Sequence, residues 1–281
     1  MIDKLTNLAT GPDSNPTTAK VWSVLTDQCW STLPSYCSNP PDLTSAFGRE
    51  LSERLTKEIY ANPTLRPPIL RALRNVVESQ TQKQGEENEP ENENENENEN
   101  EERTSNLRYL RGQAKNWLAV LFNVFASVER GERAQVGEVI GIWAGVAGEN
   151  ELAGAYRSVL GHLNTSLAAL RTNPDQSPLK EGNAKTALQM LDILLVLAPY
   201  LPIAQQAEVV GVVVHGEVLD ISEGVVQKVG MRLVGRLVDL GGEGVLTSVG
   251  GVVGLLDRLA ASERGGTVSG GKVRVPSPLS A

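Results

Sequence analysis

Apolar positions in this sequence recur at spacings of three and four, the period of an amphipathic α-helix. The pattern starts after Asn15 with the stripe Val21, Val24, Leu25, Gln28, Cys29 and Leu33. It predicts a first helix that ends where Pro34 interrupts the stripe, because proline breaks a helix interior. A turn over residues 39–42 follows, then a second helix from about Asp42 to Tyr60. Two short helices cannot bury both apolar faces alone, so this hairpin needs neighbours.

The same spacing predicts further helices, beginning near residues 65, 107, 133, 150, 184, 203, 218 and 243. The valine-rich run 209–214 fits a buried strand by propensity, but its surroundings keep the helical period. The glycine-rich run 241–244 indicates a corner between two helices rather than a phosphate-binding loop. Grouped in pairs, the ten helices begin near residues 16, 63, 131, 182 and 218. Once residues 80–104 are left out, the pairs recur about every 40 residues, which is typical of HEAT repeats.

The segment of residues 80–104 interrupts this pattern. It contains no apolar side chain and consists mainly of alternating Glu and Asn. Such a segment cannot bury enough surface to offset the entropy lost on ordering, so we expect it to be disordered. The sequence therefore predicts an all-α fold, an α-solenoid of about five HEAT-type helical hairpins over residues 15–262 with a disordered acidic insertion. Residues 1–14 and 263–281 are expected to be flexible ends.

The net charge of the chain is dominated by this insertion. The formal charge is −8, yet residues 85–102 alone carry ten Glu, and the remainder has 26 basic against 24 acidic residues. Net charge therefore argues neither for nor against nucleic-acid binding. Aromatic side chains are few, with four Trp, five Tyr and three Phe. This composition suits a core of stacked helices better than a β-sandwich.

Few residues of this chain are suited to catalysis. His162 and His215 are the two histidines, and neither has a carboxylate or cysteine at a metal-ligand spacing. We expect no enzymatic activity, no cofactor, no metal and no small-molecule substrate. Cys29 and Cys37 are interpreted as small buried hydrophobic residues in a reducing compartment. No secretory signal is recognisable, and the longest uncharged apolar run (244–256) is too short to span a bilayer. No membrane association is therefore expected.

Basic side chains offer the best candidates for a binding surface. Two rows flank the insertion at helical spacing, and the candidate RNA-contacting residues are Arg66, Arg71, Arg74, Arg108, Arg111 and Lys115. If the two helices pair, both rows approach one edge, which suits sequence-independent contact with phosphates. The alternative is an ordinary solvated face, neutralised by the nearby Glu residues. Trp22, Trp30 and Trp117 lie on apolar faces and are interpreted as core, not as base-stacking platforms.

The region from residue 15 to about 215 resembles a known family. The stretch VWSVLTDQCWSTLPSYCSNPPDLTSAFGRELSERL, with Trp-x2-Leu-Pro-Ser-x-Cys at residues 30–37, resembles the ribosomal RNA-processing protein 12 family of HEAT-repeat ribosome-assembly factors. LRPPILRALRNVVES and the segment of residues 117–163 are similar to the repeats that follow. Beyond about residue 215 the resemblance fades, because the Val/Gly-rich sequence departs from the family's pattern.

This resemblance implies a non-catalytic scaffold that binds pre-ribosomal RNA and assembly proteins during subunit maturation and nuclear export. It implies residence in the nucleolus and nucleus, with shuttling to the cytoplasm, and contact with nuclear transport factors. Family members are several times longer, so the chain is expected to be a fragment. The alternative is a karyopherin-like HEAT adaptor that holds protein cargo.

Overall fold

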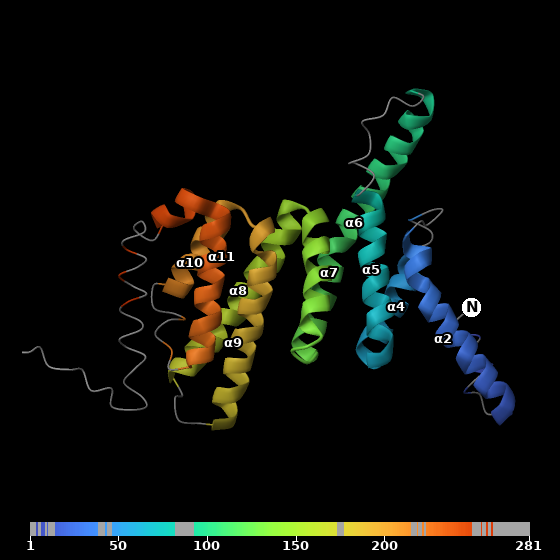
Figure 1. The fold of residues 1–281 in the computed structure, drawn as a ribbon, viewed down its shortest axis with the longest axis horizontal. Coiled ribbons are helices and arrows are strands. Elements are labelled where there is room, and N and C mark those ends of the chain that lie inside the picture. The colour runs from blue at the N-terminus through green and yellow to red at the C-terminus, as the bar shows by residue number, and fades with distance from the viewer. Residues whose placement is uncertain are drawn as a thin grey trace, which may run out of the picture. The chain divides into compact units, whose positions relative to one another are not determined.

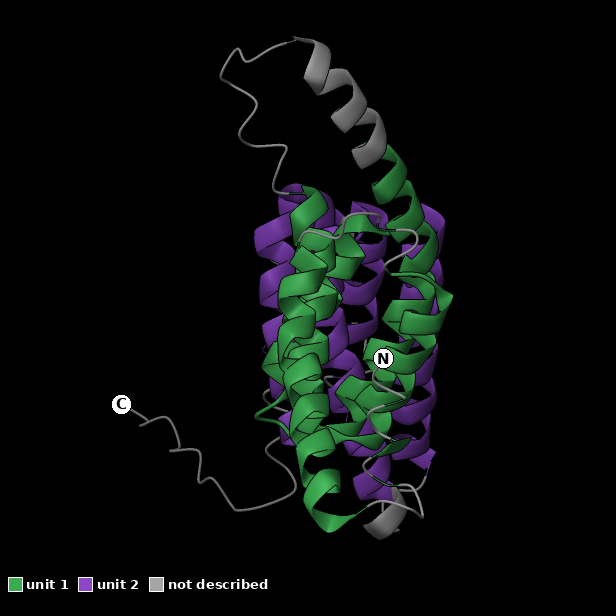
Figure 2. Cartoon of the chain, turned by 90° about the vertical axis from the view of Figure 1, so that its right-hand side faces the viewer, with its two compact units in different colours: residues 1–148 green, residues 149–281 purple. Residues whose placement is uncertain are grey.

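The computed structural model describes residues 15–38, 47–81, 93–172, 177–214 and 223–248, together with a few isolated residues. Every regular element in these ranges is helical, as Figure 1 shows, and the all-α prediction is confirmed. The chain divides into two compact units, residues 1–148 and 149–281, coloured separately in Figure 2.

The first unit contains helices in two layers. Helix α5 lies between α2 and α7 in one layer, and α4 packs beside α6 in the other. The elements are α2 (Pro16–Ser38), α4 (Arg49–Ala61), the 3-10 turn η1 (Pro63–Leu65), α5 (Arg66–Thr81), α6 (Glu93–Ser127) and α7 (Arg133–Val146). Because α4 and α6 also touch α5, this helix is covered on most of its circumference.

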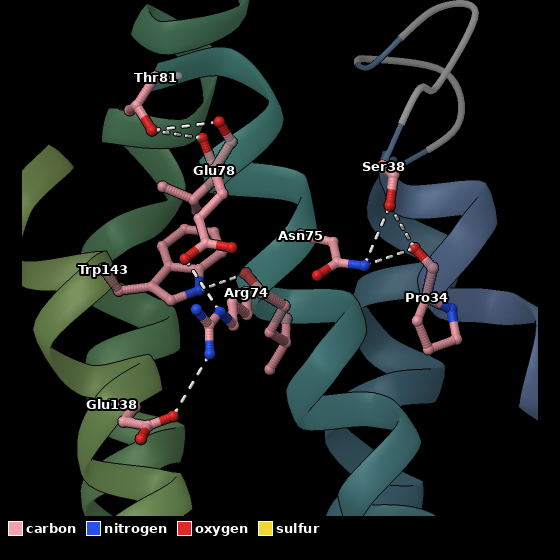
Figure 3. A network of polar contacts seen from close by, with 10 residues as sticks. Pro34, Ser38, Arg74, Asn75, Glu78, Thr81, Glu138 and Trp143 are labelled. Atoms are coloured by element: carbon pink, nitrogen blue, oxygen red, sulfur yellow. Dashed lines mark hydrogen bonds and ion pairs between the residues drawn. The ribbon is translucent and has the colours of Figure 1, made fainter.

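The buried face of α5 forms the centre of the unit's core. Its members are at most 2% exposed and comprise Ile69, Leu70, Ala72, Leu73, Val76 and Val77. An aromatic chain of Phe47, Trp117 and Trp143 lies beside them, with ring centroids 5.9 and 6.0 Å apart in tilted geometry. The Trp143 indole N–H donates to the carbonyl of Leu73 (3.1 Å), which fixes α7 against α5 (Figure 3).

Pro34 does not end the first helix as predicted. Helix α2 continues through it to Ser38, and Trp30, Leu33, Pro34 and Cys37 form its buried stripe. Proline lacks the N–H that would donate to the carbonyl of Trp30 four residues earlier. The Asn75 side chain does not replace that bond, but it links α5 to α2 by donating to the Pro34 carbonyl (2.9 Å) and to the Ser38 hydroxyl (3.0 Å), as Figure 3 shows. Burying each large apolar side chain contributes about 1.5–3 kcal/mol, so packing on α5 outweighs the break.

The predicted apolar stripe of this helix is only partly correct. Val21, Val24 and Leu25 are exposed by 54%, 49% and 36%, whereas Trp30 and Leu33 are buried. Trp22 is half-buried, while Trp30 and Trp117 belong to the core as expected. The helix contacts α5 through its second half, so periodicity identified the correct kind of element but overestimated the length of its buried face.

The second unit repeats the two-layer arrangement. Helices α9 and α11 pack together, with α8 against α9 and α10 against α11. The elements are α8 (Glu149–Thr172), α9 (Ser177–Leu197), η3 (Ala198–Tyr200), α10 (Ile203–Val212) and α11 (Gly224–Ser248). The Tyr156 hydroxyl of α8 donates to Glu208 of α10 (2.7 Å). The valine run is helical through Val212, which excludes the strand alternative there.

The predicted corner in the run 241–244 is present as a kink inside α11. Gly242 has φ 51° and ψ −132°, a conformation that side-chain-bearing residues rarely adopt. The predicted helix after residue 243 is described only as far as Ser248. The remainder of that prediction and the expected flexible tail lie outside the described residues.

Two further differences concern helix pairing and the insertion. Helices pack as α6 with α7, α8 with α9 and α10 with α11, so the predicted grouping is shifted by one helix. Residues 93–104, which we expected to be disordered, belong to the start of α6. Acidic side chains near the N-terminus of a helix interact favourably with its macrodipole, which favours a helix start within this Glu-rich stretch. Residues 82–92 lie outside the described part of the chain.

Replacing Asn75 tests the link between α2 and α5. Asn75→Ala should lower the free energy of unfolding by about 1–2 kcal/mol, because it removes both amide hydrogen bonds that link α5 to the Pro34 carbonyl and the Ser38 hydroxyl of α2. Asn75→Asp, which keeps the shape but cannot donate, should cost a similar amount. Urea denaturation followed by circular dichroism measures both. Asn123→Ala, an exposed asparagine on α6, is the matched control, and an equal loss there would contradict the assignment.

A pair of glycines tests the kink in α11. Gly242→Ala should destabilise the protein by about 1–3 kcal/mol, because alanine is strained at positive φ. Gly235→Ala should instead stabilise it by up to about 1 kcal/mol, since a methyl group there meets no atom within 4 Å. Thermal melting of both variants gives the signs, and a stabilised Gly242→Ala protein would be inconsistent with the kink.

Candidate functional site

A groove runs between α4 and α6 in the first unit, with a volume of about 740 Å³. The wall on α4 contains Arg49, Glu53, Lys57 and Tyr60. The facing wall on α6 is made by residues spaced four, three and four apart, namely Tyr109, Gln113, Asn116 and Val120. This spacing places them along one flank of the helix, so the groove follows the helix axis.

Two tyrosines in these walls are held in place by their hydroxyl groups. Tyr60 donates to the carbonyl of Val120 (3.2 Å), which joins the two walls at one end. Tyr109 donates to the carbonyl of Phe47 (2.9 Å) near the other end. Tyr60 is 41% exposed, so its ring is a fixed apolar surface that is open to a ligand.

Polar groups between the tyrosines are unused by the fold. The amides of Gln113 and Asn116 make no hydrogen bond within the described part of the chain, and Lys57 has no carboxylate partner there. Arg49, in contrast, pairs with Glu53 at 2.6 Å. The groove thus presents two free amides and one free cation. The groove is not evident in the sequence, because α4 and α6 are separated along the chain and only packing makes them neighbours.

The predicted basic residues of α5 differ in availability. The Arg66 side chain is 16% exposed, and its Nε donates to the carbonyl of Ile59 (3.1 Å) while Nη1 lies 3.6 Å from Glu132. Arg74 pairs with Glu78 (2.9 Å) and Glu138 (3.4 Å), as drawn in Figure 3, and the hydrogen bond to Glu78 raises the pKa of Arg74.

Arg71 is exposed and makes no ion pair with any described residue. Of the three arginines predicted on this helix, it is the one whose charge is uncompensated among the residues described. The sequence could not distinguish it from Arg74, because Glu138 reaches Arg74 from another helix.

The predicted basic residues of α6 form a second row. Arg108, Arg111 and Lys115 are all exposed, and at 100° per residue they lie more than about 100° around the helix axis from the middle of the groove wall. Arg111 reaches the carbonyl of Val146 (3.4 Å), the last residue of α7, whereas Arg74 meets α7 about 12 Å earlier along its axis. The six residues therefore form two short rows, and α7 contacts both.

Other reactive groups do not form a site among the described residues. Burial raises the pKa of the Cys37 thiol to about 12, so Cys37 is a thiol and not a nucleophilic thiolate at neutral pH. His162 is exposed and contacts the carbonyl of Ser158 on its own helix. No group of three or more metal-ligating side chains occurs in the part of the chain described. None of the helices searched combines the length and apolarity that crossing a membrane requires.

Comparisons with known proteins show which proteins this chain is similar to. A family defined by the HEAT repeats of ribosomal RNA-processing protein 12 matches residues 1–128. Ribosomal RNA-processing protein 12 of Saccharomyces cerevisiae is 25% identical over 221 residues, which are 79% of this chain and 18% of the relative. The putative ribosomal RNA-processing protein 12 of Schizosaccharomyces pombe is 30% identical over 226 residues, 80% of this chain and 19% of the relative.

An RRP12-like protein of Gallus gallus is 26% identical over 184 residues, 65% of this chain and 12% of the relative. The chain thus spans less than a fifth of the length of each of these relatives. The similarity reaches both compact units, because the two yeast matches are each longer than the whole first unit.

Comparing substitutions of Arg66 and Arg71 tests whether Arg66 stabilises the fold through its contacts while Arg71 does not. Arg66→Gln should reduce the free energy of unfolding by about 1–2 kcal/mol, because it removes a largely buried charged donor from the Ile59 carbonyl. Arg71→Gln should change it by less than about 0.5 kcal/mol. Urea titration of the two variants decides the assignment, and equal stabilities would show that the contacts of Arg66 are unimportant.

Proposed function

Because this chain belongs to the ribosomal RNA-processing protein 12 family, we propose that it acts in ribosome biogenesis as a non-catalytic scaffold segment. In this role it binds pre-ribosomal RNA and assembly proteins during subunit maturation and nuclear export. Its place of action is the nucleolus and nucleus, with shuttling to the cytoplasm, and nuclear transport factors are among its partners. The names of its relatives support the process, and its own surface supports the binding mode.

The proposal of RNA contact is supported by exposed cations that have no carboxylate partner in the described part of the chain. Arg71, Arg108 and Lys115 are exposed and have no carboxylate partner among the described residues. An exposed cation of this kind neutralises a phosphate and releases a counterion, which favours binding without reading the base sequence. Arg111 is a weaker candidate because part of its guanidinium is engaged with Val146. Arg66 and Arg74 are weaker still, because glutamates already neutralise them.

Neutralising the three free cations tests this proposal. The triple variant Arg71→Gln, Arg108→Gln and Lys115→Gln should bind a fluorescein-labelled single-stranded RNA more weakly in an anisotropy titration. Repeating the titration over a range of salt concentrations should show a smaller slope of log affinity against log salt. The expected decrease is about 2, from roughly 0.7 per lost phosphate contact.

The matched control has the same loss of charge at exposed lysines elsewhere. Lys20→Gln, Lys185→Gln and Lys228→Gln together remove three positive charges from α2, α9 and α11. If the control triple weakens RNA binding as much as the first triple, contact is a diffuse charge effect and the assignment is wrong. If the wild-type chain binds no RNA and captures transport cargo instead, the karyopherin-like adaptor replaces the scaffold.

A further inference from the structure

The groove between α4 and α6 has a chemistry different from that of the basic rows. It contains two amides and one ammonium group that no described residue engages, together with an anchored aromatic ring. We infer that this groove binds an extended polypeptide segment carrying an acidic residue, supplied by a protein partner. The inference goes beyond the proposed RNA contacts and does not depend on them.

Amide side chains match the backbone of an extended polypeptide. Gln113 and Asn116 each offer a carbonyl acceptor and an NH₂ donor, and an extended peptide presents both N–H and C=O groups along each edge. An amide can therefore make two complementary bonds with a main chain, independent of the peptide's side chains. Because neither amide is used by the described part of the fold, binding breaks no hydrogen bond there.

The dimensions of the groove suit a short segment. From Tyr109 to Val120 the α6 wall rises about 16 Å, which corresponds to about five residues of extended chain at roughly 3.3 Å per residue. The hydrogen bonds of Tyr60 and Tyr109 hold the rings at the two ends of this wall. Binding therefore costs little ordering of these two side chains.

Charge favours an acidic peptide over RNA at this position. Arg49 is occupied by Glu53 at 2.6 Å, which leaves Lys57 as the free cation among the lining residues described. One lysine matches one carboxylate. An RNA strand of the same length brings several phosphates, which a single free lysine does not neutralise. Of the cations suited to phosphate, Arg108 and Lys115 lie more than about 100° away around α6, and Arg71 is on α5.

Selection from a peptide library tests the inference without requiring the partner to be identified first. Phage-displayed random dodecapeptides are selected on the immobilised full chain, and the best peptide is synthesised with fluorescein for anisotropy titration. We expect selected peptides to be enriched in Glu or Asp. The double variant Gln113→Ala, Asn116→Ala should weaken binding on the order of tenfold or more, since up to four hydrogen bonds are lost. The peptide N-methylated at alternate amides should bind equally poorly.

Lys57→Met tests the acidic specificity. It should weaken binding of the acidic peptide but leave unchanged the affinity of the peptide in which Glu is replaced by Gln. Asn123→Ala, on an exposed part of the same helix as the amides, should bind like the wild type. The triple variant Arg71→Gln, Arg108→Gln, Lys115→Gln should also retain peptide binding, which separates this inference from the RNA proposal.

Three results would overturn the inference. Selection yields no binding peptide, or the selected peptides bind the Gln113→Ala, Asn116→Ala variant as tightly as the wild type. The third is that fluorescein-labelled decauridine binds the wild type and loses affinity in that variant, which would make the groove an RNA site. Circular dichroism of each variant confirms that the fold is intact.

Discussion

Helix α5 packs against α2 on one side and against α7 on the other, and the fold of the first unit depends on this double contact. Its apolar face is almost fully buried, and helix carbonyl groups on it and beside it accept additional side-chain hydrogen bonds. Trp143 supplies an indole N–H to Leu73 from α7, and Asn75 supplies an amide to Pro34 on α2. Each bond is directional, so together they fix the rotation of both neighbours around α5, which apolar packing alone leaves less specific.

The sequence pattern that identifies the family has a structural role in this chain. Trp30, Leu33, Pro34 and Cys37 are all buried residues of α2, the helix that packs against α5. Side chains available to partners lie elsewhere, on the outer turns of α5 and α6 and in the groove. A motif that packs in the core can therefore identify a HEAT-repeat protein while containing none of the proposed contact residues. Mutations in this motif should act through stability, whereas mutations of the free cations and groove amides should act through binding.

Availability of polar groups separates the proposed contact residues from chemically similar residues on the same helices. Arg66 and Arg74 have the same chemistry as Arg71, yet glutamates on other segments neutralise them. Gln113 and Asn116 carry the same amide group as Asn75, but the Asn75 amide already links α5 to α2 by a hydrogen bond. Residue type therefore does not predict function here. What decides is whether the fold already uses the group, and that depends on helices far away in sequence.

Apolar spacing alone determined the all-α class and the approximate position of most helices, because amphipathic periodicity is local to each helix. The glycine run 241–244 located the kink near Gly242, since glycine disfavours helix continuation. Tertiary structure decided which helices pair, that α2 continues through Pro34, and that only its second half is buried. It also split the six basic candidates into engaged and free side chains and created the groove between α4 and α6. The physical reason is that a helix's period is set by its own backbone, whereas the partners of its side chains are set by segments that fold against it.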